Sequence, residues 1–472
     1  MKLMKFNILF LILLSPLSMA WGQSYVSEMP NNPSDTSIVR YWDNNISIVY
    51  AYHRSDKDKH FLLVDETSPT VLRISVPEEV TVNDFRILNG KVYIGGNHVN
   101  NAGVQRGLLA FFDIQDFYNG SGNYNWELML RTPMPDCYDG GCQNQIYDIT
   151  RLAVYNDVQA GPQIAYIGKN YIVGDTSNRV GVGWATYYLG LWQNYIIYNK
   201  HAIEEYTDII ATENYVVAVA RTNDSARIAL RMYPKNNFLY PTGPWPSNPF
   251  YYNPFGRGLA DLEVDGNVMA TALDGDEFAV AYHYINSPKE GLAVKTFAIT
   301  GGGVSASLLQ SLVVPIVRQP GSTWKMRDIR YSSSLHLLAV LNDIDRGTVG
   351  SPQSIVYQFQ LPTLSVGTHL GGYLPGSNLY ALDLYGLLSQ FFVASGNVAG
   401  GGPLSLYREF FNSESACGQK DMITGDKTNP KLYETYMTTN MNQPNNYYGV
   451  KPFVVEAIDK TVICIAEPKS DN

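Results

Sequence analysis

The sequence predicts an all-β protein built from repeated four-stranded units, as two observations indicate. A hairpin-like stretch, "DIIATENYVVAVAR" (208–221), has similar counterparts about every sixty residues along the chain. These counterparts alternate apolar and polar residues, are rich in Val, Ile, Leu, Tyr and Phe, and are separated by short polar turns. Apolar runs of this kind, bounded by turn residues, are typical of β-strands.

The N-terminal segment 1–22 is interpreted as a secretory signal peptide. Lys2 and Lys5 precede an apolar stretch at 8–17, and the small residues Ala20 and Gly22 stand where a cleavage site needs them. No Cys stands directly after the apolar stretch, so a bacterial lipoprotein anchor is not expected. No later segment approaches the roughly 20 apolar residues of a membrane span. We therefore expect a secreted or periplasmic protein with a single domain over residues 23–472.

The composition excludes some partners. Charged residues make up 16% of the chain, below the roughly 25% of typical soluble domains. The formal net charge is −9, and no basic patch of the kind that contacts phosphate backbones is visible. Nucleic-acid binding is therefore disfavoured, and no sequence motif indicates a cofactor.

The four cysteines of an exported chain indicate disulfides rather than a metal site. Four cysteines allow three connectivities. We favour Cys137–Cys142, within the loop "DCYDGGC", and Cys417–Cys464, which would tie a long irregular segment to the last strand.

The repeat can be followed along nearly the whole mature chain. Its copies begin at residues 39, 84, 148, 208, 270, 328 and 383, and the last six starts lie 55 to 64 residues apart. Most copies open with Asp and are followed by one or two further alternating runs, such as "HFLLVDET" and "TVLRISVP" after the first copy. This pattern predicts four strands in most units.

Four-stranded units at regular spacing are the signature of a β-propeller, because one such sheet cannot bury both faces and must stack against neighbours around an axis. The units resemble the blades of the broad propeller superfamily, in the manner of NHL, WD40 and quinoprotein-like repeats. The resemblance lies in the pattern and in no diagnostic motif. We expect seven blades, with six or eight and a two-sandwich fold as alternatives. The hairpin expected at 453–468 is assigned to ring closure beside the first or the last blade.

A polar ring is expected at one mouth of the channel, where the leading acids would meet the residues that follow the second strand of each unit. The structural alternative is that the acids accept backbone hydrogen bonds in their own turns and that the histidines pair with neighbouring blades. The candidate ring residues are Asp84, His98, Asp148, Asp208, Arg221, His283, Asp328, Asp343 and Asp383. No short ligand spacing supports a metal site.

Two irregular segments are further candidates. Residues 233–258 gather aromatics and prolines, and Trp245, Tyr251 and Tyr252 offer either a stacking surface for sugar rings or a cap over the edge of a blade. Residues 407–450 form a long polar insertion, of a length that usually indicates function or disorder.

No common catalytic motif of a hydrolase, protease or nucleotide-binding enzyme is present. We therefore expect an exported binding protein whose ligand is a glycan or another exported protein. The alternative is a carbohydrate-active hydrolase or lyase that uses two acids at the channel mouth. A purely structural scaffold is the third hypothesis.

Overall fold

A computed structural model describes most of the strand-rich part of the chain. The described residues are 24–33, 36–43, 46–54, 57–65, 68, 70–99, 103–119, 145–157, 161–171, 179–188, 191–198, 204–222, 228–235, 264–286, 289–300, 305–315, 323–345, 353–366, 370–371, 377–385, 391–398, 403–410, 455–459 and 461–466.

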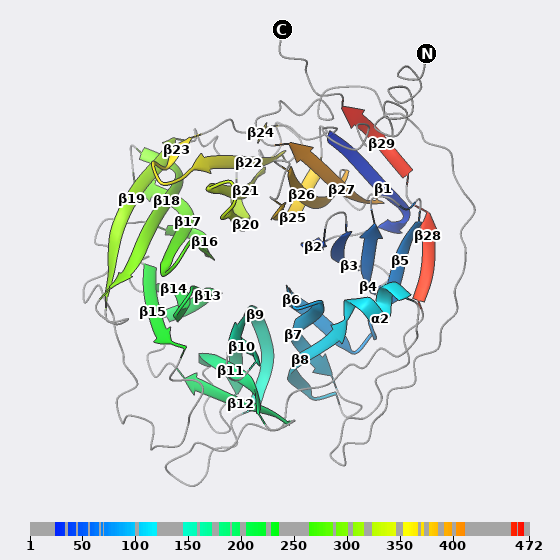
Figure 1. Ribbon diagram of the computed structural model, residues 1–472, viewed down its shortest axis with the longest axis horizontal. Coiled ribbons are helices and arrows are strands. Elements are labelled where there is room, and N and C mark those ends of the chain that lie inside the picture. The colour runs from blue at the N-terminus through cyan, green and yellow to red at the C-terminus, as the bar shows by residue number, and fades with distance from the viewer. Residues whose placement is uncertain are drawn as a thin grey trace, which may run out of the picture.

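The described strands form seven antiparallel sheets, numbered here in chain order of their innermost strand (Figure 1). The first sheet contains β2 (Thr36–Asp43), β3 (Ile46–His53), β4 (Asp58–Asp65), β5 (Thr70–Ser75) and β28 (Val455–Asp459). The second contains β6 (Val80–Leu88), β7 (Lys91–Val99) and β8 (Gln105–Asp113), followed by the short helix α2 (Ile114–Asn119). The third contains β9 (Gln145–Asp157), β10 (Gly161–Tyr171), β11 (Arg179–Tyr188) and β12 (Leu191–Tyr198).

The other four sheets complete the set. The fourth contains β13 (Glu204–Ala211), β14 (Tyr215–Thr222) and β15 (Ile228–Pro234). The fifth contains β16 (Val264–Ala272), β17 (Glu277–Asn286), β18 (Lys289–Thr300) and β19 (Ser305–Pro315). The sixth contains β20 (Thr323–Ser332), β21 (Leu337–Asp345), β22 (Gln353–Gln360), β23 (Ser365–Val366) and β24 (Leu370–Gly371). The seventh contains β25 (Ser377–Tyr385), β26 (Phe391–Val398), β27 (Pro403–Phe410), β1 (Ser24–Pro33) and β29 (Thr461–Ala466).

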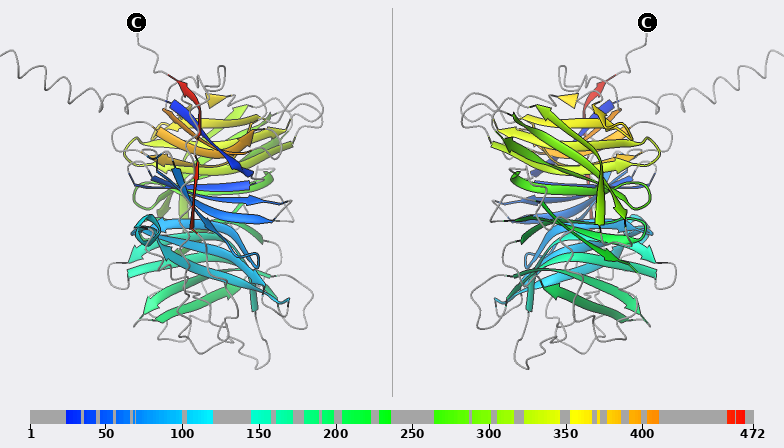
Figure 2. Two further views of the ribbon diagram at one scale, coloured as in Figure 1. Left: turned by 90° about the vertical axis from the view of Figure 1, so that its right-hand side faces the viewer. Right: turned by 90° about the vertical axis from the view of Figure 1, so that its left-hand side faces the viewer.

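The sheets lie around a common centre like propeller blades, each with its first strand innermost (Figure 1). The innermost strands β2, β6, β9, β13, β16, β20 and β25 each contact the next, and β25 contacts β2 again. Seen from the side, the sheets form one layer around this axis (Figure 2). The predicted all-β fold of repeated antiparallel units is confirmed, and every predicted unit start falls within an innermost strand.

The hydrophobic core lies between neighbouring sheets, as stacked blades require. Phe61 of the first sheet contacts Phe85 and Phe112 of the second, with ring centroids 5.4 Å apart in both pairs. A separate apolar cluster joins the first sheet to the seventh through residues such as Val49 and Leu406, both with no exposed surface. Apolar side chains thus stabilise each blade by burial against its neighbour.

Gly95 on β7 shows how closely these sheets approach. A Cβ atom at this position would lie 2.9 Å from side-chain atoms of Ile149 and Leu152 on β9. Contacts this short force the neighbouring side chains to move, so glycine lets Ile149 and Leu152 of β9 pack directly against β7. The first glycine of "YIGGNH" therefore marks a contact between two sheets, whereas a Cβ at Gly96 would meet the backbone of Thr81 in its own sheet.

The C-terminal segment corrects one expectation. The predicted hairpin at 453–468 does not form, because β28 pairs with β5 in the first sheet whereas β29 pairs with β1 in the seventh. The N-terminal strand β1 lies between β27 and β29. Both chain ends therefore contribute outer strands to the two sheets where the first and last units meet (Figures 1 and 2).

Several other expectations fall outside the described residues: the signal peptide, most of the two irregular segments, and Cys137, Cys142 and Cys417. Cys464 lies on β29, opposite Val26 of β1. Within the described part of the chain, no helix is long and apolar enough to span a bilayer.

Candidate functional site

A cavity of about 390 Å³ lies at the centre of the ring. It runs beside the N-terminal halves of β2, β6, β20 and β25, and three residues, Arg151, Asp208 and Met269, line it from the third, fourth and fifth sheets. The other lining residues are Thr36, Ser37, Ile38, Arg40, Tyr50, Tyr52, Lys59, Thr81, Val82, Asn83, Asp84, Arg86, Lys325, Met326, Arg327, Asp328, Arg330, Tyr380 and Ala381.

The aspartates of the repeat join neighbouring sheets through the backbone. Asp208 on β13 accepts the N–H of Ile209 at 2.9 Å with one oxygen and the N–H of Ala270 on β16 at 2.9 Å with the other. Asp84 on β6 likewise accepts the N–H of Leu152 on β9 at 3.0 Å. Each carboxylate therefore satisfies a backbone donor of the next sheet.

The same bond recurs in the sixth and seventh sheets. Asp328 on β20 accepts the N–H of Leu382 on β25 at 3.3 Å, and Asp383 on β25 accepts the N–H of Tyr41 on β2 at 2.8 Å. Both aspartates also accept the N–H of the residue that follows them. The bond from Asp383 joins the last sheet to the first.

These acids lie within the innermost strands, which corrects the prediction that they stand at the strand entrances. The innermost strands begin before the acid, at Val80 for Asp84 and at Glu204 for Asp208, so the acid lies inside the strand and not at its entrance. Asp84 and Asp208 are buried, with 2% and 3% of each residue exposed. A β-bulge precedes Asp84, Asp208 and Asp328, and bulges re-aim the side chains beside them.

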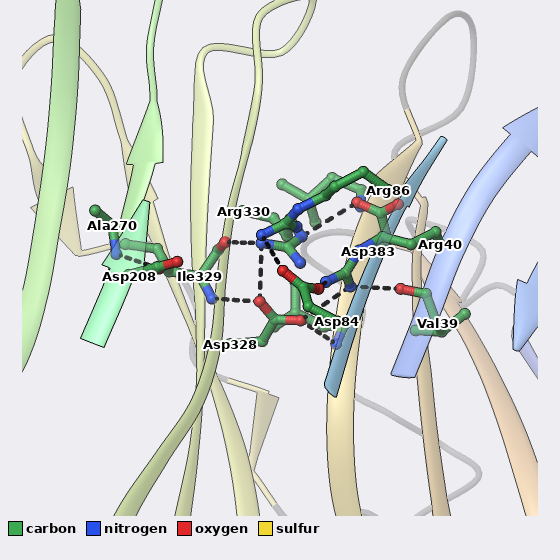
Figure 3. Close-up of polar contacts among 12 residues, drawn as sticks. Val39, Arg40, Asp84, Arg86, Asp208, Ala270, Asp328, Ile329, Arg330 and Asp383 are labelled. Atoms are coloured by element: carbon green, nitrogen blue, oxygen red, sulfur yellow. Dashed lines mark hydrogen bonds and ion pairs between the residues drawn. The ribbon is translucent and has the colours of Figure 1, made fainter. Parts of the chain in front are cut away.

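Three arginines, Arg40, Arg86 and Arg330, lie among these acids (Figure 3), and a fourth, Arg151, lines the same cavity. Arg40 on β2 places Nη2 3.2 Å from Asp84 Oδ1 and Nη1 3.4 Å from Asp328 Oδ2. Arg86 Nη2 lies 3.2 Å from Asp84 Oδ2, and Arg330 Nη1 lies 2.9 Å from Asp328 Oδ1. The fourth, Arg151, donates to the carbonyl of Thr150 at 3.2 Å. Together with Asp208 and Asp383 these residues form a charged cluster among the innermost strands, called the Arg–Asp layer below.

Burial and neighbouring charges shift the pKa values in this layer. Burial raises the pKa of Asp208, although Arg151 and Arg86 oppose the shift. Burial also acts to raise the pKa of Asp84, but Arg86, Arg40 and Arg151 outweigh it and the pKa lies below its ordinary value. The pKa of Arg40 is lowered to about 10, first by burial and then by repulsion from Arg330 and Arg86.

Further cations and aromatic rings line the same cavity beside the Arg–Asp layer. The Arg327 guanidinium lies over the Tyr380 ring, 5.3 Å from its centroid. The Lys59 ammonium lies 5.9 Å from the centroid of Tyr52 and donates to the carbonyl oxygens of Glu78 and Val80. Lys325 precedes Arg327 by two residues and is exposed. The cavity thus combines ring faces with positive charge.

Of the other candidates that the structure describes, Asp148, His98, Arg221, His283 and Asp343 are absent from the cavity lining. Asp148 accepts the side-chain amides of Asn83 at 2.6 Å and Asn97 at 2.9 Å, and its Oδ2 lies 3.6 Å from Lys169 Nζ. His98 and Arg221 lie on β7 and β14 and are absent from the lining. Asp208 and Arg221 are not directly opposite on their paired strands, since Arg221 pairs with Glu205 and Asp208 with Val219.

His283 has a structural role. Its ring is 1% exposed, and Nε2 lies 2.8 Å from Oδ1 of Asn342 on the neighbouring sixth sheet. Asp343 lies on β21, where its backbone pairs with Lys325. Trp245, Tyr251 and Tyr252 lie outside the described residues.

The cations that line the cavity were not among the residues predicted from the sequence, because the prediction rested on the acids and turns of the repeat. A signal was present: an arginine stands two residues after the acid in "DFR" (84–86) and "DIR" (328–330). Side chains two apart on a strand share a face. Over the part of the chain described here, no three His, Cys, Asp or Glu residues gather as metal ligands.

Comparison with known proteins adds little to this geometry. No protein-family model matches the chain, and the curated proteins contain no match. Among solved structures, the chain is similar to "polysaccharide lyase Uly1" at 9% identity and a TM-score of 0.43, over 79% of this chain and 90% of that one. It is also similar to a prolyl endopeptidase at 10% identity and a TM-score of 0.41, over 93% of this chain and 54% of that one. Similarity at this level says nothing about function, so the proposal below is argued from the cavity.

Proposed function

We propose that this chain is an exported seven-bladed β-propeller that binds a glycan in its central cavity. The blade count is supported by the unbroken series of contacts between successive innermost strands, which returns from β25 to β2. Export is supported by the signal-peptide pattern of residues 1–22.

The observation that carries the glycan proposal is the lining of the cavity. Two partly exposed tyrosines, Tyr52 and Tyr380, line it together with hydroxyl, amide and charged side chains, whereas Tyr50 is buried in the core beside them. Sugar rings present apolar C–H faces that suit aromatic rings, and hydroxyls that need hydrogen-bond partners.

The backbone hydrogen bonds that the acids accept favour a binding function over catalysis. Asp84, Asp208 and Asp328 all line the cavity, but each accepts backbone N–H groups of a neighbouring sheet. A carboxylate engaged in this way is held as a structural acceptor. The second candidate function, a carbohydrate hydrolase or lyase, rests on Asp208, whose pKa burial raises in the direction that a general acid requires.

A glycan array followed by calorimetry on the purified mature protein tests the proposal. We expect one glycan class to bind, and Tyr52→Ala with Tyr380→Ala to weaken it at least tenfold. Tyr331→Ala is the matched control, because Tyr331 lies outside the cavity lining and bonds Asp274. Binding that survives loss of both cavity tyrosines, or no glycan bound at all, would contradict the proposal.

The same samples separate binding from catalysis. Reducing ends report hydrolysis, and absorbance of unsaturated products reports a lyase. Turnover that Asp208→Asn abolishes while glycan affinity and the circular-dichroism spectrum stay unchanged would favour the enzyme. A binding isotherm without turnover supports the binding protein.

A further inference from the structure

Three β-bulges in the innermost strands each supply a residue to the cavity lining. The bulges leave Asn83 on β6, Arg327 on β20 and Tyr380 on β25 with no residue directly opposite on the second strand of their sheets. All three residues line the cavity. A β-bulge changes the direction of the side chain at the extra residue, and bulges are common beside active sites. These three positions are therefore suited to contact a ligand.

The side-chain amide of Asn83 is held in one orientation. Its Nδ2 donates to Asp148 Oδ1 at 2.6 Å and to the carbonyl oxygen of Ile149 at 2.8 Å, and both partners lie on β9 of the third sheet. An ionised carboxylate and a backbone carbonyl oxygen only accept hydrogen bonds, so the amide nitrogen faces them and Oδ1 faces away. The protein therefore fixes the direction of this acceptor before any ligand binds.

Asn83 Oδ1 receives no hydrogen bond from the described part of the chain. Asn83 is half-buried, and its Oδ1 is not closed off from solvent. Thr81, two residues earlier on β6, lines the same cavity, and its hydroxyl group can donate or accept. A ligand in the cavity would therefore find an oriented acceptor and a hydroxyl group on one strand.

The ring of Tyr52 lies near the part of β6 that carries Thr81. Lys59 Nζ lies 5.9 Å from the centroid of this ring and donates to the carbonyl oxygen of Val80 at 2.6 Å. Val80 directly precedes Thr81 on β6. One part of the lining therefore offers an aromatic face for the apolar C–H groups of a sugar ring and an acceptor for one of its hydroxyl groups.

We propose that Asn83 Oδ1 accepts a hydrogen bond from a hydroxyl group of the glycan, and that Asp148 is the positioning residue that holds the amide in place. This inference rests on the glycan function proposed above and names the group that selects the ligand: a free hydroxyl group of a sugar ring that packs against Tyr52. A site that accepts an O–H group rejects the analogue that lacks it, because the acceptor is then left unpaired. Asp148, an acid of the repeat, thus acts through Asn83 and does not contact the ligand itself.

NMR titration of the mature protein tests the inference with the methyl glycosides of glucose, galactose, mannose and N-acetylglucosamine, and with the monodeoxy forms of each. We expect one glycoside to bind, and one of its monodeoxy forms to bind at least tenfold more weakly. In Asn83→Leu, and in Asn83→Ala as a second variant, the glycoside should lose at least tenfold in affinity. The two probes should then bind within twofold of each other, because the acceptor that distinguished them is gone.

Asn97→Leu is the matched control. Asn97 Nδ2 donates to the same Asp148 Oδ1, at 2.9 Å, but Asn97 is absent from the cavity lining. The control removes a comparable hydrogen bond and should keep both affinities within twofold of the parent. Thermal melts check that each variant folds.

Asp148→Asn tests the positioning role. The new side chain can offer its own amide hydrogens to Asn83, so the Asn83 amide can turn and its Oδ1 no longer has a fixed direction. Discrimination between the glycoside and its monodeoxy form should fall at least threefold, and the side-chain amide protons of Asn83 should exchange with solvent faster than in the parent. Exchange and discrimination unchanged from the parent would overturn the role of Asp148.

The outcomes separate this inference from the proposed function. A parent protein that binds none of the glycosides would contradict glycan binding, and this inference with it. A bound glycoside whose discrimination survives in Asn83→Leu would overturn only the role of Asn83. Equal losses in Asn83→Leu and Asn97→Leu would give both amides a structural role alone and would also overturn it.

Discussion

Arg40 Nη1 lies 3.4 Å from Asp328 Oδ2, although 288 residues separate the two in sequence. The contact joins the innermost strands of the first and sixth sheets, β2 and β20, across the channel (Figure 3). Arg40 also reaches Asp84 of the second sheet. One arginine therefore contacts acids of two other sheets, and these acids of the repeat have a structural role in the ring.

Asp328→Asn should destabilise the protein strongly. The change removes the charge that faces Arg40 and Arg330 in a buried layer, and breaking such a pair costs about 3–5 kcal/mol. Urea unfolding measures the loss. The control Asp274→Asn removes an exposed acid that contacts Tyr331 and His336, with an expected cost below about 1 kcal/mol. Equal costs would show that the layer has no special role.

Asp208 and Asp84 should make the free energy of unfolding depend on pH with opposite signs. Because burial raises the folded pKa of Asp208, its contribution to stability is greatest below the unfolded pKa of about 3.9 and is lost as pH rises through the folded value. The folded pKa of Asp84 is lowered, so its contribution is present above about 3.9 and is lost as pH falls through the folded value.

Unfolding free energies from pH 3 to 7 for the parent, Asp208→Asn and Asp84→Asn check this sign. The advantage of the parent over Asp208→Asn should shrink as pH rises, and its advantage over Asp84→Asn should grow. Parallel slopes for the two variants would refute the assignment.

Removing residues 455–472 should weaken the first and seventh sheets together. The deletion takes away β28 and β29, and leaves β5 and β1 each without a strand that they pair with. Hydrogen exchange should rise in β5 and β1 and stay unchanged in β14, which pairs with β13 and β15 in the fourth sheet. The control deletion of residues 467–472 keeps both strands and should leave exchange unaltered.

The mature protein should begin at Gln23. Cleavage after Gly22 leaves β1 complete, since β1 begins at Ser24. Intact mass of the protein recovered from an exporting host checks this. A mass for the full 472 residues, or a start within β1, would contradict the signal-peptide assignment.

Peptide mapping without reduction should find Cys137 linked to Cys142 and Cys417 linked to Cys464. The first pair closes the short loop "DCYDGGC", and the second would tie the 407–450 segment to β29. Four free thiols in protein isolated under oxidising conditions would exclude both bridges.

The repeat itself was predictable because its signals are local. Alternation of apolar and polar residues and short polar turns mark each hairpin, so the innermost strands were located from residues such as Asp208 and Asp328. The meeting of acids and arginines in the Arg–Asp layer was not predicted, because the strands begin before the acids and β-bulges change the direction of the acid side chains. Arg40 gave no local hint that it would face Asp328.

The sequence by itself determined the strands, their repetition and therefore the all-β architecture, because period-two alternation and turn chemistry act over a few residues. Only the tertiary structure decided which strands and charges meet. The segment that looked like a hairpin was divided between two sheets, since β5 and β1 each offered an edge to pair. The cavity likewise exists only where side chains from separate blades converge on the axis, and a linear pattern does not encode that convergence.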